Sequence, residues 1–106
     1  MADKEFNSGL VRLHVLHHAA RGPIYGLWMI HELNHHGYRI GPGTMYPLLH
    51  RLEQKKYLKS RADQPGGGGQ VRRSYTITPQ GRRMLARAKV KVRELFDELF
   101  EDEPHS

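Results

Sequence analysis

Apolar residues near the start of the chain recur at the spacing of an α-helix. Because a helix brings positions three and four apart onto one side, this spacing predicts a single buried helical face. Asn7 or Ser8 can cap the start of the helix, and the Arg-Gly-Pro sequence at 21–23 should end it. The expected apolar stripe consists of Leu10, Val11, Leu13, Val15 and Leu16.

Two more helices are predicted from the same kind of spacing. The second covers residues 25–36, and Gly37 lies where a left-handed C-cap is expected. The third covers residues 42–56. Pro42 suits its first turn, whereas Pro47 removes one backbone hydrogen bond, so the helix either starts after Pro42 or tolerates that loss. The expected buried faces are Leu27, Ile30 and Leu33 in the second helix and Met45, Leu48, Leu49 and Leu52 in the third.

A β-hairpin is predicted next, because two short segments are rich in β-branched and aromatic residues. These segments are residues 58–63 and 71–78, and apolar and polar side chains alternate along the second one. The sequence QPGGGGQ at 64–70 cannot continue either strand, so we expect it to form a flexible tip.

The last helix is predicted over residues 79–102, a length of roughly 36 Å. Thr78 is its expected N-cap, Pro79 suits its first turn, and Pro104 should stop it. The small domain in front of this helix cannot cover both of its faces. We therefore expect the helix to join two chains in a homodimer, and the alternative is a helix packed on its own domain. The dimer-forming residues are a heptad stripe and one neighbour, namely Leu85, Ala88, Val92, Leu95, Leu99 and Phe96.

Length and composition limit the class of protein. A chain of 106 residues forms one domain of ordinary size. The absence of cysteine excludes disulfides and thiolate metal sites. No segment approaches the roughly 20 apolar residues that a membrane span requires. We expect a cytoplasmic protein with no membrane partner and no cofactor.

Charge is distributed very unevenly along the chain. Residues 94–106 hold six of the 11 acidic residues and none of the 17 lysines and arginines, so the net charge of +6 conceals a strongly basic remainder. Such a surface favours a polyanionic partner, because neutralised phosphates release their counterions. Double-stranded DNA is the partner we expect, and a solvated basic surface is the alternative.

The sequence HELNHH at 31–36 contains the H-E-x-x-H pattern of zinc hydrolases. On a helix, His31 and His35 lie one turn apart and can hold one ion, with Glu32 as a general base. A catalytic zinc also needs a third protein ligand in a sheltered cleft, and the nearest candidate, Glu53, lies on the third helix. We therefore predict no enzyme. Weak metal binding by His31 and His35 stays open beside their interpretation as exposed polar residues.

The order of helix, helix, helix, hairpin and helix is typical of a winged helix-turn-helix. In that fold the third helix enters the major groove of DNA and the hairpin, or wing, contacts its backbone or minor groove. The predicted fold class is mainly α with a small β-hairpin. The DNA-binding domain is residues 1–78, with the wing at about 58–78. Residues 79–103 form the dimerisation helix and 104–106 a tail.

Three segments resemble the PadR family of bacterial transcriptional regulators. They are GPGTMYPLLHRLEQKKYL, RRSYTITPQGRRML and PIYGLWMIHEL. The resemblance covers about residues 8–90 and departs from the usual family pattern at Leu27, Gly41 and Ser74. Family members are dimeric repressors whose C-terminal helices build the dimer, and this chain resembles the branch with a single such helix.

The resemblance implies a set of DNA-contacting residues. Tyr46 and Tyr75 have alternative interpretations as core residues, and Tyr75 favours the core because Ile77 points to the same side. Lys55 extends the basic surface of the third helix. The residues implied for DNA binding are Gly43, Thr44, Tyr46, Pro47, His50 and Arg51 in the third helix and Arg72, Arg73 and Tyr75 in the wing.

We predict a homodimeric repressor that binds a pseudo-palindromic operator in double-stranded DNA. A small-molecule effector or another signal is expected to shift the dimer between binding and non-binding arrangements. The rival interpretation from another class is a helix-mediated adaptor that binds proteins rather than specific DNA.

Overall fold

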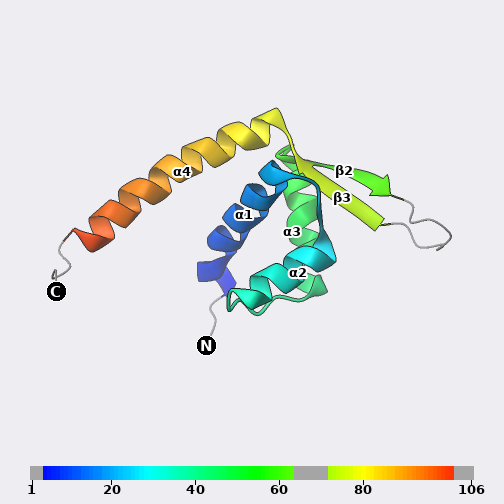
Figure 1. The fold of residues 1–106 in the computed structure, drawn as a ribbon, viewed down its shortest axis with the longest axis horizontal. Coiled ribbons are helices and arrows are strands. Elements are labelled where there is room, and N and C mark those ends of the chain that lie inside the picture. Colours follow the sequence, from blue (N-terminus) through cyan, green and yellow to red (C-terminus); the bar gives the residue numbers. More distant parts are fainter. Residues whose placement is uncertain (1–3, 64–71, 102–106) are drawn as a thin grey trace.

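The computed structural model describes residues 4–63 and 72–101 and has the expected element order, with one additional strand (Figure 1). It is mainly α-helical with a small antiparallel sheet, as predicted. The predicted wing tip at 64–70 and tail at 104–106 lie outside the described residues. The elements are α1 (Lys4–Arg21), β1 (Ile24–Tyr25), α2 (Gly26–His35), α3 (Pro42–Gln54), β2 (Leu58–Asp63), β3 (Arg72–Ile77) and α4 (Pro79–Phe100).

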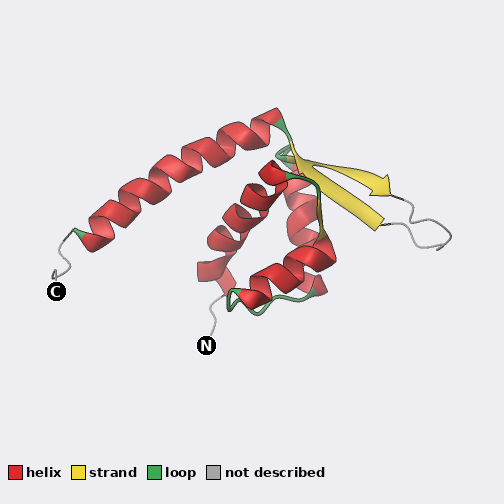
Figure 2. Cartoon of the chain, in the orientation of Figure 1, coloured by secondary structure: helices red, strands yellow, loops and turns green. Residues whose placement is uncertain are grey.

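The sheet has three strands in the order β1-β3-β2, and Figure 2 shows β2 and β3 side by side. β2 and β3 form the predicted antiparallel hairpin, in which Ser60 pairs with Tyr75. β1 was not predicted, because two residues are too short to show an alternating pattern. It adds to the other edge of β3, where Ile24 pairs with Tyr75. β3 is therefore the central strand, and it joins the wing to the start of α2.

The core lies where α1, α2 and α3 meet the sheet, and two of the predicted helical faces need correction. In α1 the core face is rotated, because Leu10 is exposed and Ala19 is buried. In α2, Leu27 is 59% exposed and Met29 takes its place in the core. The predicted face of α3 is confirmed in full. The core consists of Val11, Val15, Leu16, Ala19, Ile24, Met29, Ile30, Leu33, Met45, Leu48, Leu49, Leu52, Leu58, Tyr75 and Ile77.

Helix boundaries follow the local signals with one exception. α1 begins before Asn7 and Ser8, so neither caps it. α3 begins at Pro42 and continues through Pro47, which settles the question that the sequence left open. Gly37 has a φ of +93°, in the region that favours glycine, as expected after α2.

The end of α3, the start of β2 and the start of α4 meet at the backbone of Tyr57. The Thr78 amide donates a hydrogen bond to the Tyr57 carbonyl oxygen (3.0 Å). The Thr78 hydroxyl caps α4 as predicted, because its oxygen accepts from the Gly81 amide (2.9 Å). The same hydroxyl donates to the Lys56 carbonyl oxygen (2.6 Å). Gly81 is buried directly against the Tyr57 carbonyl group.

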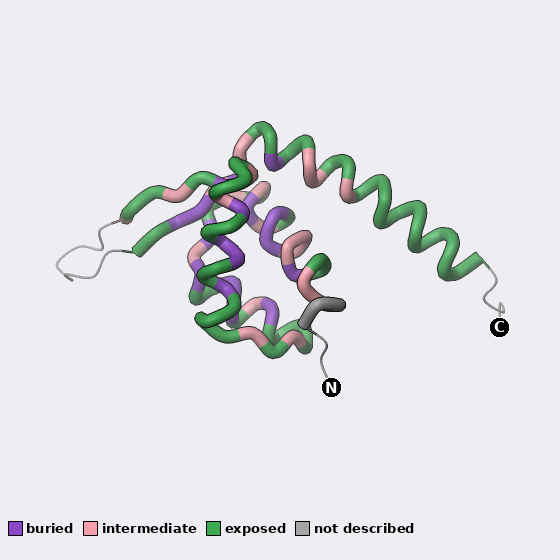
Figure 3. Tube along the Cα trace, turned by 180° about the vertical axis from the view of Figure 1, so that it is seen from behind, coloured by how far each residue is buried: buried purple, intermediate pink, exposed green. Residues whose placement is uncertain are grey.

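Within the described residues, only the first turns of α4 pack on the rest of the chain. Met84 and Leu85 are partly buried against the core, and Arg82 donates to the Ala20 carbonyl oxygen (3.2 Å). From residue 89 to residue 101 every residue is exposed (Figure 3). The helix therefore projects from the domain and gives the molecule its longest extent, 58 Å.

We predict opposite effects of alanine at two helical glycines. In Gly81→Ala the new Cβ collides with the Tyr57 carbonyl oxygen, so the free energy of unfolding should fall by about 2 kcal/mol despite the better helix propensity. In Gly9→Ala nothing lies within 4 Å of the new Cβ, so the free energy of unfolding should rise by about 0.5–1 kcal/mol. Urea unfolding at one fixed protein concentration measures both, and a neutral Gly81→Ala would contradict the close contact.

Candidate nucleic-acid interface

The side of α3 that faces away from the core carries the residues predicted to contact DNA. Four buried apolar residues hold the opposite side of the helix in the core. The helix is thus anchored along one side and open to a partner along the other. The exposed residues are Gly43, Thr44, Tyr46, Pro47, His50 and Arg51, and Lys55 is exposed just after the helix ends.

Tyr46 is 39% exposed and also packs on α2. A Cβ on Gly26 would lie 2.5 Å from a carbon of the Tyr46 ring, so only glycine leaves room for this ring at the start of α2. Both interpretations of Tyr46 therefore apply, because part of the ring packs internally and part stays open. In the sequence, the glycine at position 26 is the only sign of this close contact, and it does not identify Tyr46 as the residue that packs there.

The turn between α2 and α3 is held by Asn34, which the sequence did not single out. Its side-chain amide donates to the Ile40 carbonyl oxygen (3.2 Å), and its Oδ1 accepts from the Ile40 amide (3.0 Å). This paired contact closes the loop that leads into α3. Asn34 thereby helps to set the angle at which α3 presents its open side.

Arg72 and Arg73 are both exposed on the wing, as predicted. The Arg72 guanidinium lies over the ring of Tyr25, 4.2 Å from the ring centroid. The Tyr25 hydroxyl in turn donates to Asp63 Oδ2 (2.8 Å). This hydrogen bond, assisted by Ser74 and two nearby arginines, lowers the pKa of the Asp63 carboxyl. Tyr25 thus supports one wing arginine, although the sequence gave it no site role.

Arg73 is oriented by a contact with the other wing strand. Its guanidinium donates to Ser60 Oγ (3.3 Å), and Ser60 donates from both its amide and its hydroxyl to Glu53 Oε2 (3.0 and 2.7 Å). Glu53 lies on α3, so these bonds connect the recognition side of the domain to the wing. Glu53 therefore has a structural partner and does not face the histidines of α2.

Tyr75 does not belong to this exposed surface. It is 1% exposed and lies in the core, where burial raises the pKa of its hydroxyl. Its side chain packs among the buried residues of the core rather than on the exposed surface. This corrects its inclusion among the DNA contacts and agrees with its interpretation as a core residue.

An open groove with a volume of about 1110 Å³ lies between the start of α2 and the wing. Its lining brings Tyr46 of α3 next to Arg72 and Arg73 of the wing. The half-exposed Trp28 borders the same groove, and its indole ring contacts His18 edge to face. Tyr46 and the two wing arginines therefore share one groove, whereas Gly43, Thr44, Pro47 and Arg51 line a second one beside α1 and the loop into α3.

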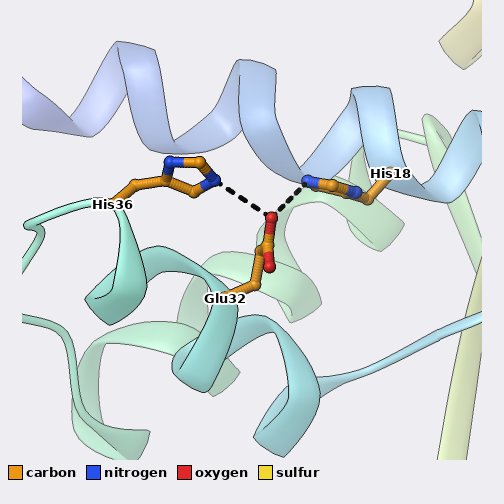
Figure 4. A network of polar contacts seen from close by, with 3 residues as sticks. All are labelled: His18, Glu32 and His36. Carbon is orange, nitrogen blue, oxygen red and sulfur yellow. Dashed lines mark hydrogen bonds and ion pairs between the residues drawn. The ribbon is translucent and has the colours of Figure 1, made fainter.

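The histidines of the H-E-x-x-H pattern do not converge on a site. His31 and His35 are both exposed. Glu32 lies instead between His18 of α1 and His36, with its Oε2 3.5 Å and 3.1 Å from their Nε2 atoms (Figure 4). Burial, together with neighbouring imidazoles, lowers the pKa of His14 and of His18.

The predicted dimerisation residues divide into two groups. Leu85 and Ala88 are partly buried near the domain, whereas the later members of the stripe are exposed, with no cover in the described part of the chain. A continuous exposed apolar face of this kind marks an interaction surface. The exposed members are Val92, Leu95, Phe96 and Leu99, with Phe100 beside them. Within residues 4–63 and 72–101, no helix has the length and apolar character needed to cross a membrane.

Comparisons with known proteins agree with this geometry. The model of the transcriptional regulator PadR-like family matches residues 15–87. A transcriptional regulator of Mycobacterium tuberculosis is 44% identical over 103 residues, which cover 97% of this chain and 94% of that protein. The crystal structure of a PadR family transcriptional regulator from Eggerthella lenta shares 32% identity, with a TM-score of 0.79 over 92% of this chain and 84% of that one. A PadR-like transcription factor from Bacteroides fragilis, at 22% identity and a TM-score of 0.80 over 92% and 94% of the two chains, shares the fold.

We predict that Tyr25→Phe raises the pKa of Asp63 towards its ordinary value. The variant keeps the aromatic ring beneath Arg72 and removes only the hydroxyl that stabilises the carboxylate. Titration of the Asp63 carboxyl carbon by NMR measures the change. Tyr57→Phe is the matched control and should leave the Asp63 pKa unchanged. An unchanged Asp63 pKa in Tyr25→Phe would show that groups other than the Tyr25 hydroxyl lower it.

Proposed function

This chain belongs to the PadR-like family of transcriptional regulators, and on that basis we propose that it is a homodimeric repressor of a pseudo-palindromic operator. Family membership makes it a DNA-binding, non-enzymatic regulator, which rules out the zinc hydrolase interpretation. The observation that carries the finer proposal is that α3 and the wing both expose polar and basic residues, with Tyr46 and the wing arginines along one groove, beside a long helix with an uncovered apolar face.

In the proposed complex, α3 lies in the major groove and reads base edges with its open side. Thr44, His50 and Arg51 present hydrogen-bonding groups there, and each is exposed. The first amides of α3, near Gly43, suit a backbone phosphate, because a helix N-terminus favours an anion. Gly26 and Asn34 support this contact indirectly, since they position Tyr46 and the loop into α3.

The wing adds affinity that does not depend on sequence. Arg72 and Arg73 are each held by an internal contact that leaves the residue exposed. Side chains that are already oriented lose less conformational entropy when they bind a phosphate. Their contribution should be electrostatic and should weaken as salt is added.

The proposed homodimer forms through the exposed apolar face of α4. Val92, Leu95 and Leu99 keep heptad spacing beyond the part of α4 that packs on its own domain. Two-fold pairing of this helix would place the two α3 helices at successive major-groove faces, roughly 34 Å apart. A ligand that changes the pairing of α4 would change this spacing, which is how we expect an effector to act.

We predict that the double substitution Arg72→Ala and Arg73→Ala weakens binding to all DNA sequences. The plot of log affinity against log salt should become shallower by about one unit for each lost phosphate contact. Fluorescence anisotropy with operator and unrelated DNA over a range of salt concentrations measures both effects. The double substitution Arg83→Ala and Arg87→Ala removes the same charge from α4 and should leave the slope nearly unchanged. An unaltered slope in the wing variant would mean that the wing lies away from DNA.

We predict that Leu95→Asp combined with Leu99→Asp converts the dimer to a monomer at micromolar concentration. Two buried carboxylates are incompatible with an apolar interface. Light scattering after size exclusion measures the mass, and circular dichroism checks that the fold is kept. Val90→Asp is the matched control, because Val90 is equally exposed but lies on the opposite side of α4 from the stripe. A monomeric wild-type chain would refute the dimer, and a dimer without sequence-selective DNA binding would favour the adaptor.

A further inference from the structure

Four side chains with metal-binding groups face one another between α1 and α2. His14 and His18 lie one turn apart on α1, and Glu32 and His36 are likewise four residues apart on either side of the end of α2. Figure 4 shows the Glu32 carboxylate between the imidazoles of His18 and His36. We call these four residues the α1–α2 histidine cluster. Neither DNA binding nor dimerisation uses it.

The cluster is compact and partly shielded from solvent. The rings of His14 and His36 stack with centroids 5.6 Å apart, and those of His14 and His18 lie 6.5 Å apart. The side chains of His18 and Glu32 are only 19% and 25% exposed. Tyr38 closes one side, with its ring edge-on to that of His14 and the two ring centroids 5.4 Å apart. The imidazoles are therefore held near one another by two packed helices.

We propose that the α1–α2 histidine cluster is a binding site for a divalent transition metal ion of the zinc type. His14, His18 and His36 would supply nitrogen ligands and Glu32 an oxygen ligand. Three imidazoles and one carboxylate form a donor set that suits zinc and its neighbours rather than magnesium or calcium. With all four positions filled by the protein, the site is closed and would brace the two helices rather than catalyse.

The spacing of the rings fits this ion, although their orientation must change. With metal–nitrogen bonds of about 2.1 Å and tetrahedral angles, the centroids of two coordinating rings lie roughly 5.5 Å apart. The distance from His14 to His36 matches that value at 5.6 Å, whereas the distance from His14 to His18 is longer, at 6.5 Å. Among the described residues no three donor atoms yet converge on one point. Binding therefore requires ring rotations, and the ion would replace the contacts that Glu32 makes with His18 and His36.

The proposed ligands differ from those that the H-E-x-x-H pattern suggests. His31 and His35 share one exposed side of α2, and the ring of His36, 5.8 Å from that of His35 between centroids, contacts Glu32 and His14 instead. Glu32 and His36 face α1 instead, where a second pair of residues completes the set. The two interpretations therefore name different residues, which makes them separable by substitution.

Zinc titration of the full chain, purified without a histidine tag and stripped with chelator, tests this proposal. Calorimetry should show one ion bound per chain, and thermal unfolding should shift to higher temperature, because the ion binds only the folded pair of helices. His14→Ala, His36→Ala and Glu32→Gln should each weaken zinc binding at least tenfold and reduce the thermal shift. Cobalt in place of zinc should give the visible bands of four-coordinate cobalt.

The matched controls are histidines outside the cluster. His17→Ala and the double substitution His31→Ala with His35→Ala remove the same groups and should leave zinc affinity within about twofold. Circular dichroism of the metal-free variants confirms that each one is folded. Zinc binding that survives in His14→Ala and His36→Ala, or that is lost with His31 and His35, would overturn the proposal. No saturable binding at millimolar zinc would overturn it as well.

Discussion

The contact of Gly81 with the Tyr57 carbonyl group determines how the long helix α4 is placed relative to the rest of the domain. Three elements meet there, because Tyr57 joins α3 to β2 and Thr78 joins β3 to α4. The Thr78 hydroxyl bonds in two directions, to the start of α4 and to the Lys56 carbonyl oxygen. The long helix therefore leaves the domain in a direction set by the backbone at the end of α3.

The α3 helix combines a buried apolar side with an exposed polar side. Its four buried apolar residues secure it in the core, so its opposite side can stay polar and open. Its neighbours add the finer placement, because Gly26 leaves room for Tyr46 and Asn34 closes the entering loop. Under the proposed function these contacts matter, because a helix that is already held in place loses less entropy when it binds a partner.

Polar residues of the wing and between α1 and α2 form short chains of contacts, here called relays, in which one side chain connects two others. Tyr25 connects Arg72 to Asp63, and Ser60 connects Arg73 to Glu53. Glu32 performs a comparable role between two histidines. In each case a charged side chain near the surface contacts a residue from another helix or strand. Such relays are difficult to recognise in sequence, since their members lie far apart along the chain, as Tyr25 and Asp63 do at a separation of 38 residues.

Local patterns in the chain were enough to specify the element order, the winged-helix fold and the family. Helix caps, proline positions and heptad spacing depend on residues close together in sequence, so Thr78, Gly37 and the α4 stripe could be recognised without coordinates. The apolar face of α3 was also predictable, because four large side chains leave one way to orient it. The exposure of Leu27, the burial of Tyr75 and the pairing of β1 depend on neighbours from distant segments. The same is true of Glu32. In the sequence it stands between His31 and His35, but in the fold it contacts His18 and His36.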